Sequence, residues 1–254
     1  MTLDPGTHTE TTRLDAQRLA AAARSILACP RDVQLVVDGI DDVTDGLDQD
    51  RLEMQDHSGR PVFSCPAGSA LALAATDRRG ALLTLGSGLG PEGSADRDAT
   101  LTLSGRLDAV GLEQCECCDE VRMRIALHLD FVLLTRTGLP AVAPGAPEAV
   151  RIRVPLGAFT SPDHDLNRGF LQRSTEHANL CHQDELRRAI ATLTQTRLGE
   201  VLGVHLAGLR PDGVTLQWVD PTGAHTTDLH FPRPAASTQE LGEMLRSELH
   251  AGLC

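Results

Sequence analysis

The sequence predicts an α+β protein in two parts: a β-rich first part, and a smaller second part in which helices flank three strands. Three observations support this fold class. Short runs of alternating apolar and polar residues dominate up to about residue 160. A long helical pattern begins near residue 175. Three further strand patterns follow it, and Pro-Asp-Gly and Pro-Thr-Gly turns separate them.

Three segments are expected along the chain. Residues 1–12 are predicted to be a disordered N-terminus, 13–165 a β-barrel domain and 166–254 an αβββα domain. The first residues are polar and Thr-rich, without the basic start and apolar run of a signal peptide, so a cytoplasmic location is expected. No uninterrupted apolar run approaches eighteen residues, which argues against a membrane span.

The first part is expected to open with a helix over 14–28, where apolar residues recur on one face. The segment 69–76 is ambiguous, and 113–129 is predicted to be a helix. The first two strands are expected to pair across the acidic turn at 39–50. Six or so strands suggest a closed or nearly closed small barrel, and their patterns lie at 32–38, 51–56, 61–65, 81–85, 99–110, 130–137 and 150–160.

The second part is predicted to begin with one helix over 175–197. Strands are expected at 201–209, 214–219 and 224–231. The last helix opens with Ser237-x-x-Glu240, a capping box in which each side chain satisfies a backbone group of the other residue.

Composition argues against a nucleic-acid partner. The net charge is −12, and all 23 basic residues are Arg. Tyr is absent, and five Phe with one Trp are too few aromatic residues for a platform that stacks on single-stranded bases.

The cysteines do not predict a disulfide framework. Their number is odd, seven, and the expected compartment is reducing. Cys29, Cys65 and Cys181 are expected to be buried small hydrophobic residues. The cluster Cys115-Glu-Cys117-Cys118 lies on the predicted helix 113–129, where its thiols would not converge, so a metal site there is not favoured.

The segment His177-Ala-Asn179-Leu-Cys-His182 is the most informative cluster of polar residues. His182 is in register with Leu186 and Ile190, which predicts that it faces the apolar side of its helix. On a regular helix His177 would point about 140° away from His182, so the pair is not expected to bind one ion. Two interpretations remain: Asn179 and His182 fasten the helix by hydrogen bonds, or they contact a ligand.

Several motifs together resemble a known family. The segment His177–His182, followed by Pro211-Asp-Gly213, Phe231-Pro232 and Glu240-Leu241, resembles a small domain of unknown function appended to split-barrel proteins of the haem-utilisation group. A plant protein that binds glutamyl-tRNA reductase shares that domain. Upstream, Leu101-Thr-Leu-Ser-Gly105-Arg106-Leu107 and Asp130-Phe131 resemble strands of the pyridoxamine-phosphate-oxidase-like split β-barrels.

The resemblance implies a homodimer that binds haem or another tetrapyrrole and takes part in haem handling or degradation. Arg side chains would pair with the propionates, and a His would ligate the iron. The resemblance offers His177, Asn179, His182 and Arg106 as cofactor contacts. The family's iron ligand does not map onto a particular position here, and His177 and His250 are the candidate iron ligands that the chain itself supplies.

Two alternative functions remain open, as does the question of whether the protein is an enzyme. Flavin-binding split barrels carry a His-Thr-x-Asn segment after the third strand, but residues 83–98 here are acidic and Gly-rich, so FMN is not the favoured cofactor. The missing segment favours a non-catalytic regulator that binds another protein. An FMN-dependent oxidoreductase is the third hypothesis.

Overall fold

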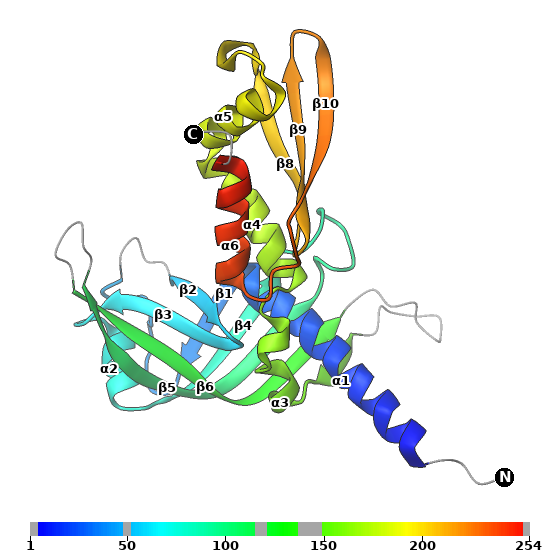
Figure 1. Ribbon diagram of the computed structural model, residues 1–254. Helices are drawn as coiled ribbons and strands as arrows, with labels where there is room; N and C mark the ends of the chain where they lie inside the picture. Colours follow the sequence, from blue (N-terminus) through cyan, green and yellow to red (C-terminus); the bar gives the residue numbers. More distant parts are fainter. Residues whose placement is uncertain (1–4, 48–51, 115–120, 137–148, 251–254) are drawn as a thin grey trace. The chain divides into compact units, whose positions relative to one another are not determined.

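The computed structural model describes residues 5–47, 52–114, 121–136 and 149–250 (Figure 1). The chain divides into two compact units, Met1–His164 and Asp165–Cys254. Each unit contains its own cluster of buried apolar side chains. None of the helices in the described ranges is long and apolar enough to cross a membrane.

The first unit combines helices with seven strands in one antiparallel sheet. Its first helix begins at Pro5, so residues 5–12 are helical where disorder was predicted. Pro is tolerated in the first turn of a helix, and the residues that follow are compatible with helix without an apolar face of their own. The elements are α1 Pro5–Ala28, β1 Pro30–Val37, β2 Met54–His57, β3 Arg60–Pro66, α2 Ala70–Thr76, β4 Gly80–Ser87, β5 Thr100–Gln114, β6 Val121–Arg136, β7 Val150–Arg153, α3 Leu156–Phe159 and the 3-10 turn η2 Pro162–His164.

The sheet of the first unit is a curled half-barrel. Its strand order is β1-β4-β5-β6-β3-β2, and β7 pairs with the far end of β6. In the described part of the chain no ladder joins β1 to β2, so the sheet is open rather than fully closed. α1 packs against β2, β4 and β5, and α2 packs against β3, β5 and β6.

The predicted pairing of the first two strands is wrong. β1 pairs with β4, and β2 pairs with β3. The register of β1 with β4 sets Leu35 opposite Leu83 and Val33 opposite Leu85, so these four apolar residues share the inner face. That match decides the pairing, because a strand buries its apolar set only in one register.

The predicted helix over 113–129 is also wrong. Gln114 ends β5 and Val121 begins β6, so the described residues of this segment are strands of a long antiparallel pair. Cys115, Cys117 and Cys118 lie outside the described residues. In the ambiguous segment 69–76, Ser69 caps α2 by accepting a hydrogen bond from the backbone N–H of Ala72 at 3.2 Å.

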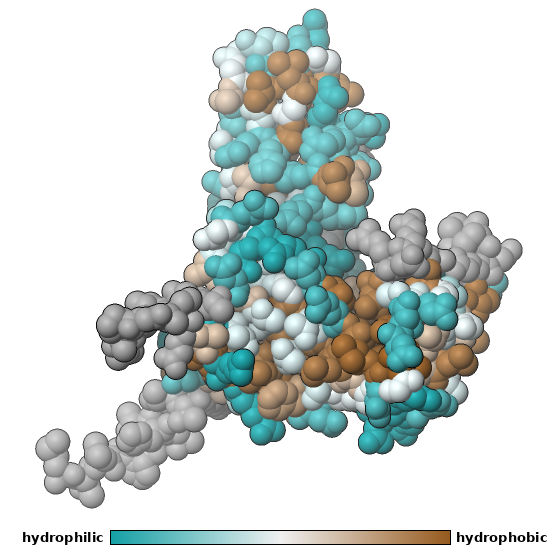
Figure 2. Space-filling view, turned by 180° about the vertical axis from the view of Figure 1, so that it is seen from behind, coloured by the Kyte–Doolittle hydropathy of each residue, from teal (hydrophilic) through white to brown (hydrophobic). Residues whose placement is uncertain are grey.

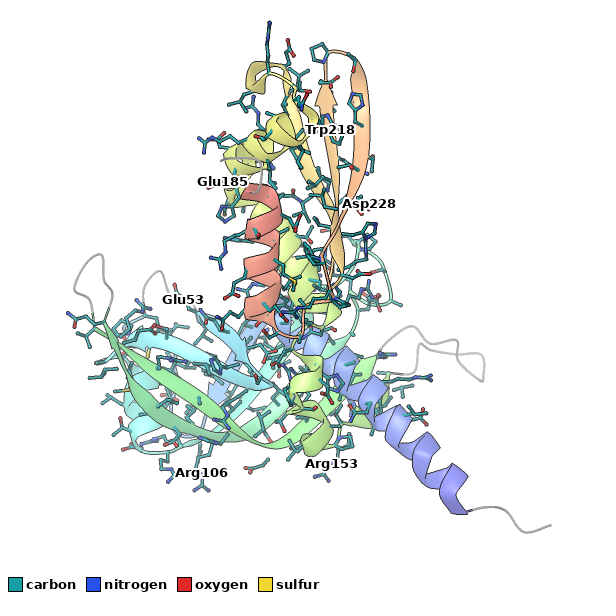
Figure 3. The ribbon with its side chains drawn as sticks, viewed as in Figure 1. Glu53, Arg106, Arg153, Glu185, Trp218 and Asp228 are labelled. Carbon is teal, nitrogen blue, oxygen red and sulfur yellow. The ribbon has the colours of Figure 1, made fainter. Side chains whose placement is uncertain are left out.

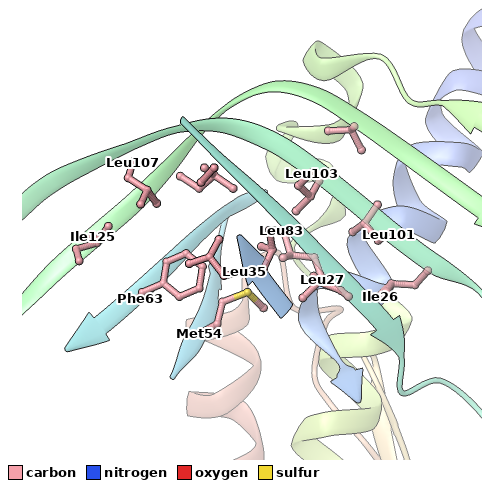
Figure 4. Packing of buried hydrophobic residues seen from close by; sticks show 14 of the residues in the cluster. Ile26, Leu27, Leu35, Met54, Phe63, Leu83, Leu101, Leu103, Leu107 and Ile125 are labelled. Atoms are coloured by element: carbon pink, nitrogen blue, oxygen red, sulfur yellow. The ribbon is translucent and has the colours of Figure 1, made fainter. Parts of the chain in front are cut away.

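The inner face of the curled sheet is filled with side chains (Figure 4). Phe63 and Met54 from β3 and β2 lie among Leu83, Leu103 and Ile125, and all five are buried. These buried side chains therefore occupy the inside of the half-barrel.

The second unit packs helices against a three-stranded antiparallel sheet of order β10-β9-β8. Its strands lie within two residues of the predicted ranges, but the single predicted helix is two helices that meet at His182. The elements are α4 Arg168–Cys181, α5 Gln183–Thr194, the 3-10 turn η3 Leu198–Glu200, β8 Gly203–Arg210, β9 Gly213–Asp220, β10 Gly223–His230 and α6 Thr238–His250.

Arg24, near the end of α1, is a fully buried cation in the core of the first unit, with 1% of its surface exposed. Its Nε donates to Asp56 Oδ2 at 3.1 Å, and its Nη1 donates to the carbonyl oxygens of Phe159 and Ser161. Asp56 Oδ1 in turn accepts a hydrogen bond from the backbone N–H of Gly59 at 2.7 Å. The guanidinium thus ties α1 to the β2–β3 turn and to the segment after α3.

Replacing Arg24 by Met is expected to lower the free energy of unfolding of the first unit by about 3–5 kcal/mol, because the buried Asp56 carboxylate loses its counterion. Urea denaturation followed by circular dichroism measures the change. The matched control is Arg31→Met, which breaks an exposed ion pair with Asp32 and should cost no more than about 1 kcal/mol. Equal effects of the two substitutions would contradict the role of Arg24.

Candidate functional site

Arg106 and His128 are cross-strand neighbours on the outer face of β5 and β6. Arg106 alternates with the buried Leu107, and His128 alternates with the buried Leu127, so both polar side chains point away from the core. The register shifts between Ser104 and Gly105, which is a β-bulge. Ser104 pairs with Phe131, whereas the next residue, Gly105, pairs with Leu129, so the register shifts by one residue immediately before the pair of Arg106 and His128.

Gly105 is required by this bulge. A Cβ built on Gly105 would lie 1.9 Å from the carbonyl oxygen of His128, closer than any side chain can approach. The glycine in the strand motif Leu101–Leu107 thus has a structural reason: only a residue without a side chain lets the two strands come this close.

The basic side chains near Arg106 outnumber the carboxylates that contact them. Asp108 Oδ2 lies 3.3 Å from His128 Nε2, and Asp108 Oδ1 lies 3.8 Å from Arg78 Nε. Within the described ranges no carboxylate lies within ion-pair distance of Arg106. Asp108 therefore faces one guanidinium and one imidazole, and the positive charge of Arg106 is available for an anion.

An apolar row lies next to this cluster on the outer face. Val36 pairs with Leu82, Leu82 with Ser104, and Ser104 with Phe131, so the row crosses four strands. Val36 is 64% exposed and Leu82 is 44% exposed. Figure 2 shows hydrophobic residues gathered on the visible face of the first unit.

A second cation borders the row. The guanidinium carbon of Arg153 lies 5.3 Å from the centre of the Phe131 ring. Figure 3 shows Arg106 and Arg153 on the same side of the curled sheet. The outer face therefore offers apolar surface bordered by guanidinium groups and one imidazole.

The second unit brings His177 and His182 together, which the sequence did not predict. Their Nε2 atoms lie 3.3 Å apart, and the ring planes are inclined by 75°. The expected 140° separation holds only for a continuous helix, whereas α4 ends at Cys181 and His182 has φ −121° and ψ 31°. This break turns the His182 side chain toward His177. Both rings are exposed, so the prediction that His182 faces the apolar side is wrong.

Glu185 completes this cluster. Glu185 lies in the first turn of α5 and is labelled in Figure 3. Its Oε2 lies 3.1 Å from His182 Nδ1. Because a carboxylate only accepts hydrogen bonds, this contact requires the proton of a neutral His182 to sit on Nδ1 and leaves the lone pair on Nε2.

Asn179 fastens α4 to the edge of the sheet. Its Nδ2 donates to the carbonyl oxygen of Leu206 at 2.9 Å, and its Oδ1 accepts from the backbone N–H of Leu206 at 2.8 Å. β8 is an edge strand, so the Asn179 amide satisfies backbone groups that no neighbouring strand can reach. The fastening role that the sequence left open is confirmed for Asn179, whereas the His182 side chain contacts His177 and Glu185.

A third polar cluster lies at the β9–β10 turn. The rings of Trp218 and His225 stack with centres 5.1 Å apart, and His225 Nε2 lies 3.0 Å from Asp220 Oδ1. Hydrogen bonds from Thr222 and His225 lower the pKa of Asp220 to about 2. Local turn residues account for all of these contacts, so we assign the cluster a structural role.

The cysteines of the described segments form no ligand set. Cys29 and Cys65 are buried as predicted, and burial raises the pKa of the Cys65 thiol, which makes a reactive thiolate there unfavourable. Cys181 is exposed, so its predicted burial is wrong. Across the part of the chain that the structure describes, no group of three or more His, Cys, Asp or Glu side chains is placed to hold a metal ion.

The predicted cofactor contacts fall into different units. Arg106 belongs to the first unit, whereas His177, Asn179 and His182 belong to the second. His250 is the last residue of α6, and its side chain lies outside the described residues. Sequence reasoning missed His128, because 113–129 was taken for a helix. It also missed Glu185, whose spacing of three from His182 was the available signal.

Replacing Gly105 by Ala is expected to destabilise the first unit by about 1–3 kcal/mol, because the added methyl group collides with the His128 carbonyl. Thermal and urea unfolding measure the loss. Gly111→Ala in the same strand is the control, since a Cβ there meets no atom within 4 Å. An unchanged Gly105→Ala protein would show that the strands relax freely at the bulge.

Replacing Asn179 by Ala is expected to lower the free energy of unfolding of the second unit by about 1–3 kcal/mol, since two hydrogen bonds to Leu206 are lost. Fluorescence of Trp218, the only tryptophan, reports unfolding of this unit. Leu180→Ala is the control on the same helix, because Leu180 is 84% exposed. A similar loss in both variants would argue against a specific role of the Asn179 amide.

Comparisons with known proteins do not assign a family. No protein-family model matches the chain, and no curated protein matches it. Among solved structures, a heme binding protein from Mycobacterium smegmatis is 14% identical with a TM-score of 0.37, over 92% of this chain and 97% of that one. A protein of unknown function from Agrobacterium tumefaciens is 16% identical with a TM-score of 0.36, over 91% and 94%. A candidate general stress protein 26 from Jannaschia is 12% identical with a TM-score of 0.35, over 54% and 98%.

Proposed function

We propose that this chain binds haem, or another anionic tetrapyrrole, on the outer face of the curled sheet in its first unit. In this proposal the first unit is a split β-barrel of the haem-utilisation type, and the second is the αβββα domain appended to such barrels. The protein acts in the cytoplasm as a homodimer. The observation that carries the proposal is the position of Arg106, free of any ion pair with a described residue, beside His128 and an exposed apolar row.

The residues present fit the chemistry of a tetrapyrrole. A haem site needs an imidazole or thiolate ligand, apolar walls and cations for the propionates. His128 supplies an imidazole that is 47% exposed, and Leu82 and Phe131 supply apolar surface. Arg106 supplies a guanidinium that can bind a propionate with two parallel hydrogen bonds.

Iron ligation by His128 requires its Nε2 to leave the contact with Asp108. The Asp108 carboxylate lies 3.3 Å from the His128 Nε2 that would ligate iron. If Nε2 turns to a ligand, Asp108 keeps Arg78 as its ion-pair partner at 3.8 Å, so the carboxylate is not left without a cation. The proposal therefore moves the iron-ligand role from His177 and His250 to His128.

The same surface supports the proposed homodimer. A second copy placed over Val36 and Leu82 would cover apolar surface that the described chain leaves exposed. A macrocycle at such an interface would be shielded from water on both faces.

Hemin titration followed by absorption spectroscopy tests the proposed function. The full chain is expected to give a saturating Soret band with one hemin per chain. Arg106→Glu should weaken hemin binding by about tenfold or more, because one charge-assisted hydrogen-bond pair to a propionate is replaced by repulsion. His128→Ala should shift or abolish the Soret band, because the proposed iron ligand is lost.

Matched variants make this test specific. Arg188→Glu, on α5 of the second unit, makes the same charge change on an exposed arginine outside the proposed surface and should leave binding unchanged. Loss of the Soret band in His177→Ala, but not in His128→Ala, would place the iron ligand in the second unit and contradict the outer-face site. A chain that ignores hemin would contradict the proposed function and favour the protein-binding regulator. A flavin spectrum would favour the oxidoreductase.

A further inference from the structure

We infer that His177 and His182 bind a divalent first-row transition-metal ion such as Zn²⁺, at a site distinct from the proposed tetrapyrrole surface. Their Nε2 atoms lie 3.3 Å apart. Zn–N bonds are about 2.0–2.1 Å long, so a tetrahedral ion holds two imidazole nitrogens about 3.3–3.4 Å apart. In the metal-free chain this contact is an N–H···N hydrogen bond, and a metal ion would displace its proton with little change in the separation of the two nitrogens.

Glu185 prepares one of the ligands. Its carboxylate lies 3.1 Å from Nδ1 of His182, where it fixes the tautomer that leaves the Nε2 lone pair for a metal. A carboxylate on the second nitrogen of a ligating His is the common arrangement in metal sites, where it orients the ring and raises its basicity.

The junction between α4 and α5 holds the pair in place. The backbone N–H of His182 donates to the carbonyl of Ala178 at 3.0 Å, and its own carbonyl accepts from Leu186 at 3.0 Å. Gln183 Nε2 donates to the carbonyl of Asn179 at 2.8 Å, across the same break. Hydrogen bonds fix the backbone on both sides of His182. Binding of a metal ion would therefore cost little conformational entropy for ordering its ligands.

The site would be open to solvent. Both imidazoles are exposed, and the described residues supply no third ligand, so water would complete the coordination. Imidazole suits Zn²⁺, Ni²⁺ and Cu²⁺, and affinity should rise toward Cu²⁺ in the order general for divalent ions. Hard oxygen-preferring ions such as Mg²⁺ and Ca²⁺ should not bind.

Zn²⁺ titration by isothermal calorimetry tests the inference, with hemin absent. The protein is the full chain in which the thiols that could compete for zinc are replaced by Ser, at Cys115, Cys117, Cys118, Cys181 and Cys254. One equivalent of Zn²⁺ is expected to bind. His177→Ala and His182→Ala should each abolish that equivalent, and Glu185→Gln should weaken it about 10–100-fold, the range found when such carboxylates are removed.

His205→Ala is the matched control, since His205 is an exposed histidine of the same unit on β8. It should bind Zn²⁺ as the parent does. Circular dichroism establishes that each variant is folded, and a rise in the unfolding temperature with Zn²⁺ that is lost in His177→Ala gives a second readout. Unchanged Zn²⁺ binding in His177→Ala and His182→Ala, or no binding by the parent chain, would overturn the inference. Either result leaves the hemin titration unaffected, because that test rests on residues of the first unit.

Discussion

The buried guanidinium of Arg24 is the constraint around which the first unit is arranged. An isolated charge in an apolar core is costly, so its position is set by the groups that satisfy it, namely Asp56 and two backbone carbonyls from residues far along the chain. The same constraint explains Gly59. A Cβ there would lie 2.8 Å from the Phe159 carbonyl and 3.1 Å from Arg24 Nη1, so the turn can approach only without a side chain. One cation thus fixes a helix, a turn and a distant segment together.

Both candidate sites arise where regular secondary structure is interrupted. In the sheet, the bulge at Gly105 sits beside the cross-strand pair of Arg106 and His128. In the second unit, the end of α4 turns His182 toward His177, which a continuous helix would keep apart. Interruptions of this kind cost backbone hydrogen bonds, and here side chains replace part of them, as Gln183 does at the α4–α5 junction.

The two sites differ in the chemistry they can support. The outer face of the sheet combines apolar area with guanidinium groups, which suits a flat, amphipathic anion. The pair of imidazoles with Glu185 offers two nitrogen donors at a chelating distance, which suits a bare metal ion. Haem iron and a free divalent ion would therefore be recognised by different groups of this protein.

The sequence alone determined the α+β class and most strands, because alternation and turn chemistry are local properties. The turns Pro211-Asp-Gly213 and Pro221-Thr-Gly223 located β8, β9 and β10 to within two residues. It did not determine β6, where residues 121–129 have a helix-compatible composition and only pairing with β5 makes them a strand. It also could not give the His177–His182 distance, because that depends on a helix break that local pattern does not signal. Pairing partners and breaks are decided by which residues can be buried together, and that is settled only when the whole chain has folded.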